Sequence, residues 1–420
     1  MRAKTKTVLK GFDYMHCDDF AKYLSDMAAK GWHFKEWGVG LKFEKGEPEH
    51  AVYAIEVFTK ASEDDMRPEP KTQEFAEYCE AAGWKFIDAK QKFCIFKKID
   101  EHAVELFTPE ERVNNAFKGT FSGQYITLFL LSGLNALLNW VNLNSFFERN
   151  IFAGTHIFGI SVWTTMFLMH LILFASAFWK RMTLRKAIRE GKQIYIGNCQ
   201  DGKYHWNLKD VYAAFLIVLL TWYFCMMDKI GLVILNVAII VVTIGFSVII
   251  NKIRPEREAN IIVQIVFAIV LVISIIVCTL IILTEDDNTR KDDTIPLVMA
   301  DYKESGDVIE DMSYSRDSNF LGSAEIYFIF GKETSIYYHI YKSEHAWILD
   351  KIWKEQLEEK KYNEELVDYT EEWGARQAWR NKIGIYYVRY EDSILVFSDD
   401  EDIYLTTDQI NIILEKLDLR

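Results

Sequence analysis

The chain has few of the residues that usually build a covalent or metal-bound framework. It contains six cysteines in 420 residues, and the last of them is Cys278, so the final third of the chain cannot form a disulfide. No CxxC pair occurs, which removes the usual signal of a structural zinc site or a redox dithiol. Four residues have side-chain atoms that could ligate a metal, but their spacing in the sequence is not that of a metal site: His16, Cys17, Cys79 and Cys94. We therefore expect no metal site and no cofactor.

Charge is scarce in the middle of the chain, where five apolar runs follow one another. A membrane core of about 30 Å needs roughly 20 helical residues. The runs therefore predict a transmembrane region over 121–283 with spans near 121–141, 157–179, 211–227, 230–250 and 261–283. Only Asp228 and Lys229 separate the third run from the fourth. One helix through both would be about 60 Å long, so we expect a tight helical hairpin there.

Polar groups inside these runs are also few. His170 is the one ionisable residue within them, and Asn135, Asn139 and Gln264 are the notable amides. That set is too small for a proton relay or a coupled ion path. We expect His170 to form an interhelical hydrogen bond rather than to serve transport or catalysis.

Basic residues gather on one side of the predicted spans. The stretch 180–210 holds eight Lys and Arg residues, and the short loop before the fifth span adds Lys252, Arg254 and Arg257. The positive-inside rule then predicts a multi-pass protein of the cell membrane with a cytoplasmic N-terminus and an extracytoplasmic C-terminus. The first residues contain no signal-peptide apolar core, which agrees with an N-terminal domain that stays in the cytosol.

Most of the acidity lies in the last segment, where residues 284–420 hold 32 Asp and Glu against 16 Lys and Arg. Such a surface repels nucleic acid, which we do not expect as a partner. Alternating aromatic runs and two amphipathic stretches predict an extracytoplasmic α+β domain over 284–420. The acidic run 399–402 has neither a loop glycine nor a downstream bidentate glutamate, so we interpret it as a solvated turn rather than a calcium loop.

The first hundred residues contain a weak duplication, seen in DMAAKGWHF and CEAAGWKF. Each half has the pattern of a strand, a helix and two strands, and Gly31 and Gly83 stand where the helices should end. Asp18 or Asp19 is the expected cap of the first helix. Residues 1–115 are therefore predicted to form a cytoplasmic α+β domain of two similar units.

This region resembles the bacterial domain-of-unknown-function family 2812. The resemblance is carried by FDY at 12–14, MAAKGW at 27–32, KFEKGEPE at 42–49, AGW at 82–84 and ELFTPEER at 105–112, and it covers about residues 1–115. It implies a membrane protein in a regulatory setting, often encoded beside PadR-type repressors, and it brings no functional residues.

Tandem units of this kind are also similar in topology to the GyrI-like small-molecule-binding domains. By that comparison six aromatic residues could line a pocket for an apolar cation or a peptide: Trp32, Trp37, Phe43, Tyr53, Trp84 and Phe93. The alternative, that they fill the core of the domain, is the interpretation we favour.

No catalytic motif is present, so we do not expect an enzyme. Two folded domains joined by spans without transport chemistry predict a membrane-anchored sensory or regulatory protein, with the lipid bilayer and a cytoplasmic transcription regulator as partners. The alternative is an accessory subunit of a transporter or envelope-assembly complex, whose spans would dock onto a membrane-protein partner.

Overall fold

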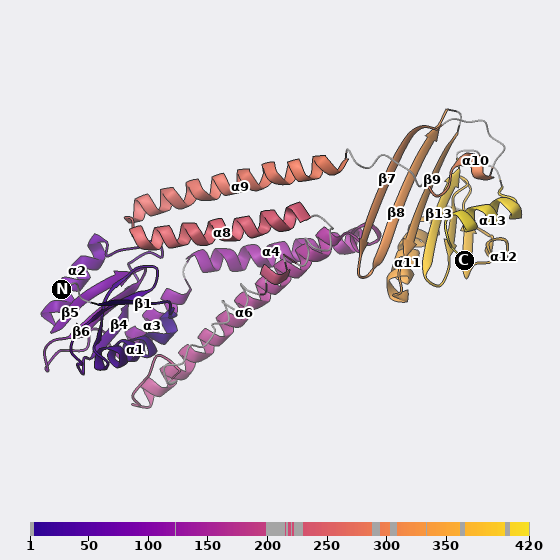
Figure 1. Cartoon of the computed structure of the whole chain (residues 1–420). Coiled ribbons are helices and arrows are strands. Elements are labelled where there is room, and N and C mark those ends of the chain that lie inside the picture. The colour runs from indigo at the N-terminus through magenta and orange to yellow at the C-terminus, as the bar shows by residue number, and fades with distance from the viewer. Residues whose placement is uncertain are drawn as a thin grey trace. The chain divides into compact units, whose positions relative to one another are not determined.

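The structure is a computed structural model that describes residues 4–121, 123–198, 215, 217–219, 221, 230–287, 295–302, 309–332, 334–361, 366–399 and 404–419. The chain divides into two compact units (Figure 1). The first comprises Met1–Gly133 with Thr165–Glu285, and the second comprises Leu134–Thr164 with Asp286–Arg420. All three boundaries between the units, at 133/134, 164/165 and 285/286, fall inside long helices.

The N-terminal domain has the duplicated architecture that the sequence predicted. Its first half is β1 (Thr5–Val8), α1 (Cys17–Ala29), β2 (Trp32–Trp37) and β3 (Leu41–Lys45), and its second half is β4 (Tyr53–Val57), α2 (Pro70–Ala81), β5 (Trp84–Lys90) and β6 (Phe93–Lys98). Each half forms a three-stranded antiparallel sheet with the last strand in the centre, in the orders β1-β3-β2 and β4-β6-β5. A register shift interrupts β2 between Phe34 and Glu36 and β5 between Phe86 and Asp88.

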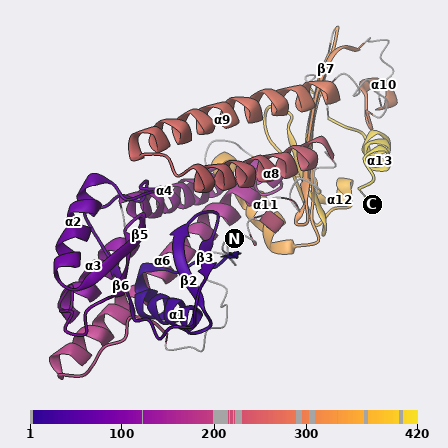
Figure 2. The same cartoon turned by 60° about the vertical axis from the view of Figure 1, so that its left-hand side comes forward.

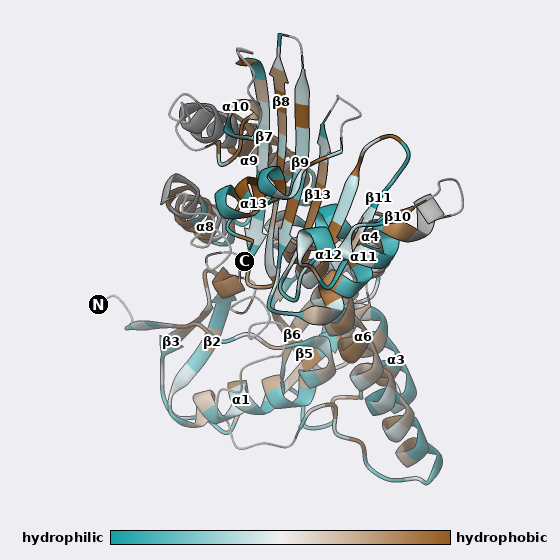
Figure 3. Ribbon diagram, turned by 90° about the vertical axis from the view of Figure 1, so that its right-hand side faces the viewer, coloured by the Kyte–Doolittle hydropathy of each residue, from teal (hydrophilic) through white to brown (hydrophobic). Residues whose placement is uncertain are grey.

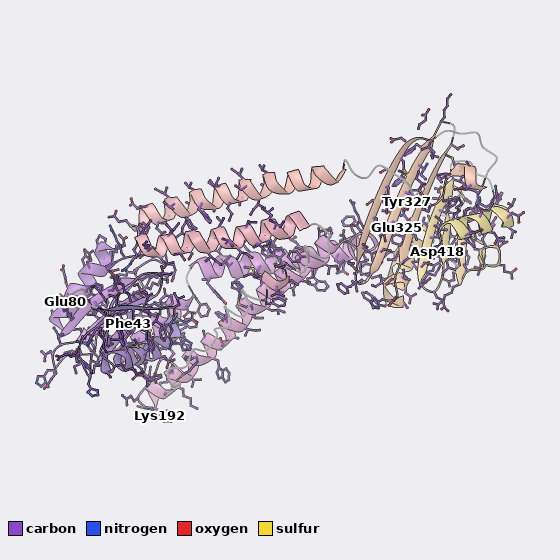
Figure 4. All side chains as sticks on the ribbon, in the orientation of Figure 1. Phe43, Glu80, Lys192, Glu325, Tyr327 and Asp418 are labelled. Atoms are coloured by element: carbon purple, nitrogen blue, oxygen red, sulfur yellow. The ribbon has the colours of Figure 1, made fainter. Side chains whose placement is uncertain are left out.

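Glycine ends both helices of this domain. Gly31 (φ 75°) and Gly83 (φ 89°) adopt the left-handed conformation that follows a helix, which a side chain would strain. The expected cap was wrong, because His16 is the residue before α1, while Asp18 and Asp19 lie in its first turn. The core joins both halves: Phe20 and Leu24 of α1 pack with Phe43, Ile55 and Ile95. Figure 4 labels Phe43 inside this domain and Glu80 on its outside.

Four long helices in the described residues are apolar enough to cross a membrane: α4 (Gly123–Ser145), α6 (Gly154–Arg189), α8 (Ile230–Ile253) and α9 (Arg257–Asp287). They correspond to four of the five predicted spans and are compatible with a multi-pass membrane protein. The third predicted span, 211–227, and the turn at Asp228 and Lys229 lie largely outside the described residues, although 215, 217–219 and 221 are helical. α8 and α9 run side by side in Figures 1 and 2, and Phe246 stacks on Phe267 at 3.8 Å between ring centres.

A short helix, α3 (Pro109–Thr120), leads from the domain into α4. Its first turn is closed by a capping box, in which Glu111 N donates to Thr108 Oγ1 and Thr108 N donates to Glu111 Oε2. Pro109 at the first helical position supplies the backbone angle that a helix start needs. The sequence ELFTPEER therefore sets the point where the chain turns toward the spans.

The C-terminal domain is built on one antiparallel sheet of seven strands, in the order β10-β11-β12-β13-β9-β8-β7. The strands are β7 (Ile309–Asn319), β8 (Gly322–Gly331), β9 (Ser335–Lys342), β10 (Val367–Asp368), β11 (Gln377–Arg380), β12 (Tyr386–Arg389) and β13 (Ser393–Asp399). β8 and β9 form an antiparallel hairpin. One face packs in a core with α10 (Met299–Tyr302), α12 (Thr370–Trp373) and α13 (Thr407–Lys416). In Figure 3 α13 carries both hydrophilic and hydrophobic positions, as its amphipathic pattern predicted.

The other face of this sheet packs in a second core with α11 (Ala346–Lys361) and with α5 (Phe147–Asn150) and its neighbours. Phe147, Ile151 and Phe152 are buried there against Tyr341 and Ile394. Residues 142–156 lie between the first two predicted spans, and the structure shows that they contribute to the hydrophobic core of the C-terminal domain.

Candidate functional site

The six aromatic residues that could line an inner pocket, and for which core packing was the favoured interpretation, are divided between two cores. Phe43, Tyr53 and Phe93 are buried in the main core, with Trp32 and Trp37 packed against it. Trp84 belongs to the separate core beneath α2, because it opens β5 beside that helix, and its Nε1 donates to Val104 O at 2.7 Å.

Trp37 and Phe93 also line a cavity of about 420 Å³ that lies beside Lys10, Lys90 and Asn251. Lys90 Nζ donates to Asn251 Oδ1. Burial lowers the pKa of Lys90, and nearby Arg254 adds to this. Two of the six residues therefore line a cavity, and ligand binding by the set stays the alternative to the favoured core packing.

The strongest polar contacts of the N-terminal domain run to the helices of the same unit. The turn between α8 and α9 inserts Arg254, whose φ of 51° directs the chain back toward α9. Its guanidinium pairs with both oxygens of Asp88, Nη1 to Oδ2 at 2.8 Å and Nη2 to Oδ1 at 2.9 Å. The same side chain donates to the carbonyls of Met66, Trp37 and Ala89. Because Trp37 belongs to one half of the domain and Asp88 to the other, Arg254 binds both.

A second arginine extends this contact into the first turn of α9. Arg257 pairs with Asp65 through Nε and Nη2, at 2.5 and 2.7 Å, and the side chain of Asp65 is 1% exposed. The backbone N–H of Arg257 donates to Glu69 Oε1, and Asn260 Nδ2 donates to Asp64 O. Buried carboxylates are costly unless paired, so these contacts specify one position of the turn on the domain.

The segment that follows α6, which ends at Arg189, makes the corresponding contact on α1. Residues 195–198 run along its first turn: Ile196 N donates to Asp18 Oδ2 at 2.6 Å, and Asn198 N and Tyr195 OH each donate to Asp19 at 2.9 Å. Ile196 is 1% exposed and lies in the main core. Carboxylates in the first turn also interact favourably with the helix dipole.

Arg112 of α3 connects this contact to the sheet. It donates to Asp18 Oδ1 at 2.7 Å and to both oxygens of Glu56 at 3.0 and 3.3 Å. Two carboxylates thus share one guanidinium in a region where Glu56 is 5% exposed. Burial raises the pKa of Glu56 to about 7, against the attraction of Arg112 and with the repulsion of Asp18.

The described thiols and His170 contact groups of the protein's own fold. Cys79 and Cys94 lie in the core beneath α2 and Cys17 in the main core, and burial raises the pKa of all three thiols. Within the described residues no group of three His, Cys, Asp or Glu side chains is placed to hold a metal. His170 Nδ1 contacts Met166 O of its own helix at 2.7 Å, so the interhelical bond predicted for it is made instead by its backbone carbonyl, which accepts from Tyr125 OH.

The sequence matches one known protein family. Residues 17–131 match the DUF2812 family, described as a protein of unknown function. The DUF2812 match confirms the resemblance stated for the N-terminal region. It begins at α1 and extends past the predicted limit of 115 into α4, so it includes α3 and its capping box. Neither curated proteins nor solved structures gave a match.

Proposed function

We propose that this protein is a membrane-anchored regulatory protein whose helices couple the C-terminal domain to the N-terminal domain. The observation that carries the proposal is the division of α4 and α6 between the two compact units. The segment joining them supplies Phe147, Ile151 and Phe152 to the core of the C-terminal domain. At its other end α6 leads to Ile196, which is buried in the core of the N-terminal domain. A movement in the core of the C-terminal domain would therefore be transmitted along α6 to the core of the N-terminal domain.

The charged contacts of the N-terminal domain support the same proposal. The segment that follows α6 binds the first turn of α1, through Ile196 N to Asp18 and Asn198 N to Asp19. The α8–α9 turn binds both halves of the domain through Arg254. If α4 and α6 moved relative to α8 and α9, the contact between the two halves of the domain would be strained. Such a contact is the kind of two-state element that a signal can bias.

For the membrane arrangement we propose five spans with the N-terminus in the cytoplasm. The interval 199–229 begins beside Asn198, which is bound to Asp19, and ends at Ile230, the first residue of α8. α8 has 24 residues and is about 36 Å long, and Arg254 beyond its last turn is bound to the same domain. Ile230 is thus about one membrane thickness, along the axis of α8, from the domain that binds both Asn198 and Arg254, and this supports a crossing within the interval. The basic ends of α6 and α8 favour the cytoplasmic side for this domain.

The topology can be tested by labelling single cysteines in intact cells. With the native cysteines replaced, Glu344→Cys in the C-terminal domain should react with a membrane-impermeant maleimide, and Glu80→Cys in the N-terminal domain should react only after permeabilisation. Both side chains are exposed in the structure, so access is decided by the membrane alone. Labelling of Glu80→Cys in intact cells would refute the orientation.

The regulatory role can be tested by purifying the full chain in mild detergent from its native cells and identifying what remains bound. A transcription regulator that binds the wild-type protein and is lost in Arg254→Ala but not in Lys252→Ala would support the proposal. Both variants remove one positive charge near the same turn, but Lys252 is exposed and Arg254 binds the domain. Recovery of a permease or an ATPase, unaffected by either variant, would instead support an accessory subunit of a transporter or envelope-assembly complex.

A further inference from the structure

Three large aromatic side chains of the second compact unit are exposed next to the ends of two apolar helices. They are Phe146, Phe320 and Trp347, each between 57 and 63% exposed. Phe146 directly follows α4, Phe320 lies in the turn between β7 and β8, and Trp347 lies in the first turn of α11. Single exposed apolar residues are common on proteins, so what matters is the position of these three relative to the helices.

Trp347 and Phe146 lie at the C-terminal end of α4. The ring of Phe147, the residue after Phe146, has its centre 6.2 Å from that of Trp347. One turn further along α11, Lys351 Nζ donates to Asn144 Oδ1 in the last turn of α4 at 3.1 Å, and it lies 3.8 Å from the centre of the Phe147 ring. The beginning of α11 is therefore held against the point where α4 ends.

The turn that carries Phe320 lies at the other end of the connection between α4 and α6. Asn319 Nδ2 donates to Ile151 O at 2.9 Å, shortly before α6 begins. Gly322, which follows the turn, approaches Phe152 so closely that a Cβ atom there would lie 2.7 Å from Cε1 of that ring. Phe320 is thus held beside the start of α6.

The last turns of α4 have the composition of a membrane interface. The helix is apolar enough to span a membrane, and the exposed large side chains that precede Trp140 are mainly leucine. Trp140 is exposed roughly 8 Å along the axis before the helix ends, and Asn142 and Asn144 follow it. Tryptophan is enriched where the hydrocarbon of a bilayer meets its headgroups, whereas amides avoid hydrocarbon. With α4 as a span, the hydrocarbon core ends near Trp140, and Phe146 lies at the level of the headgroups.

We propose that the C-terminal domain docks on the surface of the bilayer, with Phe146, Phe320 and Trp347 inserted among the lipid headgroups. This depends on α4 being a membrane span, as proposed above. The exposed apolar surface of α4 continues through Phe146 to the other two side chains, so a bilayer that surrounds the helix also covers them. Phe and Trp are residues that interfacial segments bury in this layer.

The test measures contact with lipid by site-directed fluorescence on the full chain in phosphatidylcholine vesicles. With the native cysteines replaced, five variants each carry one cysteine labelled with bimane: Leu137→Cys, Phe146→Cys, Phe320→Cys, Trp347→Cys and Ile383→Cys. Ile383→Cys is the matched control, because this side chain is also exposed and lies in the turn between β11 and β12. The strand register places that turn at the opposite end of the sheet from the β7–β8 turn. All five side chains are exposed, so no substitution removes a core residue.

Quenching is measured with lipids that carry a nitroxide at a shallow or at a deep position of the acyl chain. We expect the shallow nitroxide to quench the labels at Phe146, Phe320 and Trp347 at least about twofold more than the label at Ile383. The deep nitroxide should quench the label at Leu137, which is exposed on α4 itself.

The label at Leu137 separates a failure of this proposal from a failure of the proposed span. Quenching at Leu137 without quenching at Phe320 and Trp347 would overturn the docking and leave the span intact. No quenching at Leu137 would refute the span and the docking together. Labels at Phe320 and Trp347 with blue-shifted emission that lipid nitroxides do not quench would mean that protein, such as a second copy of the chain, covers this surface, which would also overturn the proposal.

Discussion

The contact between Arg254 and Asp88 gives the sharpest prediction about how the N-terminal domain is held. In Arg254→Ala the two hydrogen bonds to the carboxylate and three to backbone carbonyls are lost. Asp88 keeps only donors from Trp37 N and Ala89 N, while its side chain is 7% exposed. Stranding a buried charge in this way costs about 3–5 kcal/mol.

This loss of stability should appear as more frequent local opening of the domain. Since about 1.4 kcal/mol corresponds to a tenfold change in an equilibrium constant, amides of β5 and β6 that exchange through this opening should exchange at least about 100-fold faster. Hydrogen exchange followed by mass spectrometry on the full chain in nanodiscs measures this directly. Lys252→Ala is the matched control, because it removes an exposed charge near the same turn.

A second variant separates the stranded charge from the lost packing. Adding Asp88→Asn to Arg254→Ala neutralises the carboxylate and should recover part of the protection in β5. If Arg254→Ala exchanged within a few-fold of Lys252→Ala, or if Asp88→Asn brought no recovery, the assignment of this pair as the main attachment would be refuted.

Three further predictions concern other buried contacts. Because burial raises the pKa of Glu56 from 4.5 to about 7, its protonated form stabilises the fold below pH 4.5, and about 3 kcal/mol of that stability should be lost as the pH rises through 7. Glu56→Gln should remove this loss. Phe152→Ala, at a fully buried position, should destabilise the C-terminal domain by about 3–5 kcal/mol, and Phe146→Ala, at an exposed one, by much less. Thr406→Ala should cost about 1 kcal/mol by opening the capping box of α13.

Thermal unfolding of the full chain measures all three. For Glu56 the comparison is the difference in Tm between wild type and Glu56→Gln at pH 5 and pH 7, and a constant difference would contradict the raised pKa. Equal Tm values for Phe152→Ala and Phe146→Ala would contradict the place of 147–152 in the C-terminal core. No change in Thr406→Ala would mean that the bonds between Thr406 and Gln409 contribute nothing measurable.

The amino-acid sequence was sufficient where local patterns decide the structure. Period-two alternation and the glycines at 31 and 83 predicted the duplicated domain, because a left-handed residue ends a helix wherever it stands. The spacing of Thr406 and Gln409 is a local signal of the same kind, and in the structure it opens the last helix. Length and hydropathy were enough to find the apolar helices, since a membrane span is a local property of about 20 residues.

Contacts between distant residues could not be read in this way. Asp88 and Arg254 are separated by 166 positions and Asp18 and Ile196 by 178, so no periodicity relates them. The basic loop at 252–257 was visible, but it was interpreted only through the positive-inside rule. Asp65 and Arg257 are 192 positions apart and Asp64 and Asn260 are 196 apart, so nothing local in the acidic run 63–65 pointed to these contacts.

The tertiary structure also decided which aromatic residues share a core. The sequence does not distinguish Trp84 from Trp37, yet the two side chains pack in different clusters. The reason is that the two sheets pack against different helices. The segment 147–152 looked like a connection, and only the placement of α4 and α6 brings it onto the sheet of the C-terminal domain. The sequence alone determined the elements and the apolar helices, which depend on neighbours along the chain. Tertiary packing decided the attachments and cavities, which depend on side chains that the chain brings together from far apart.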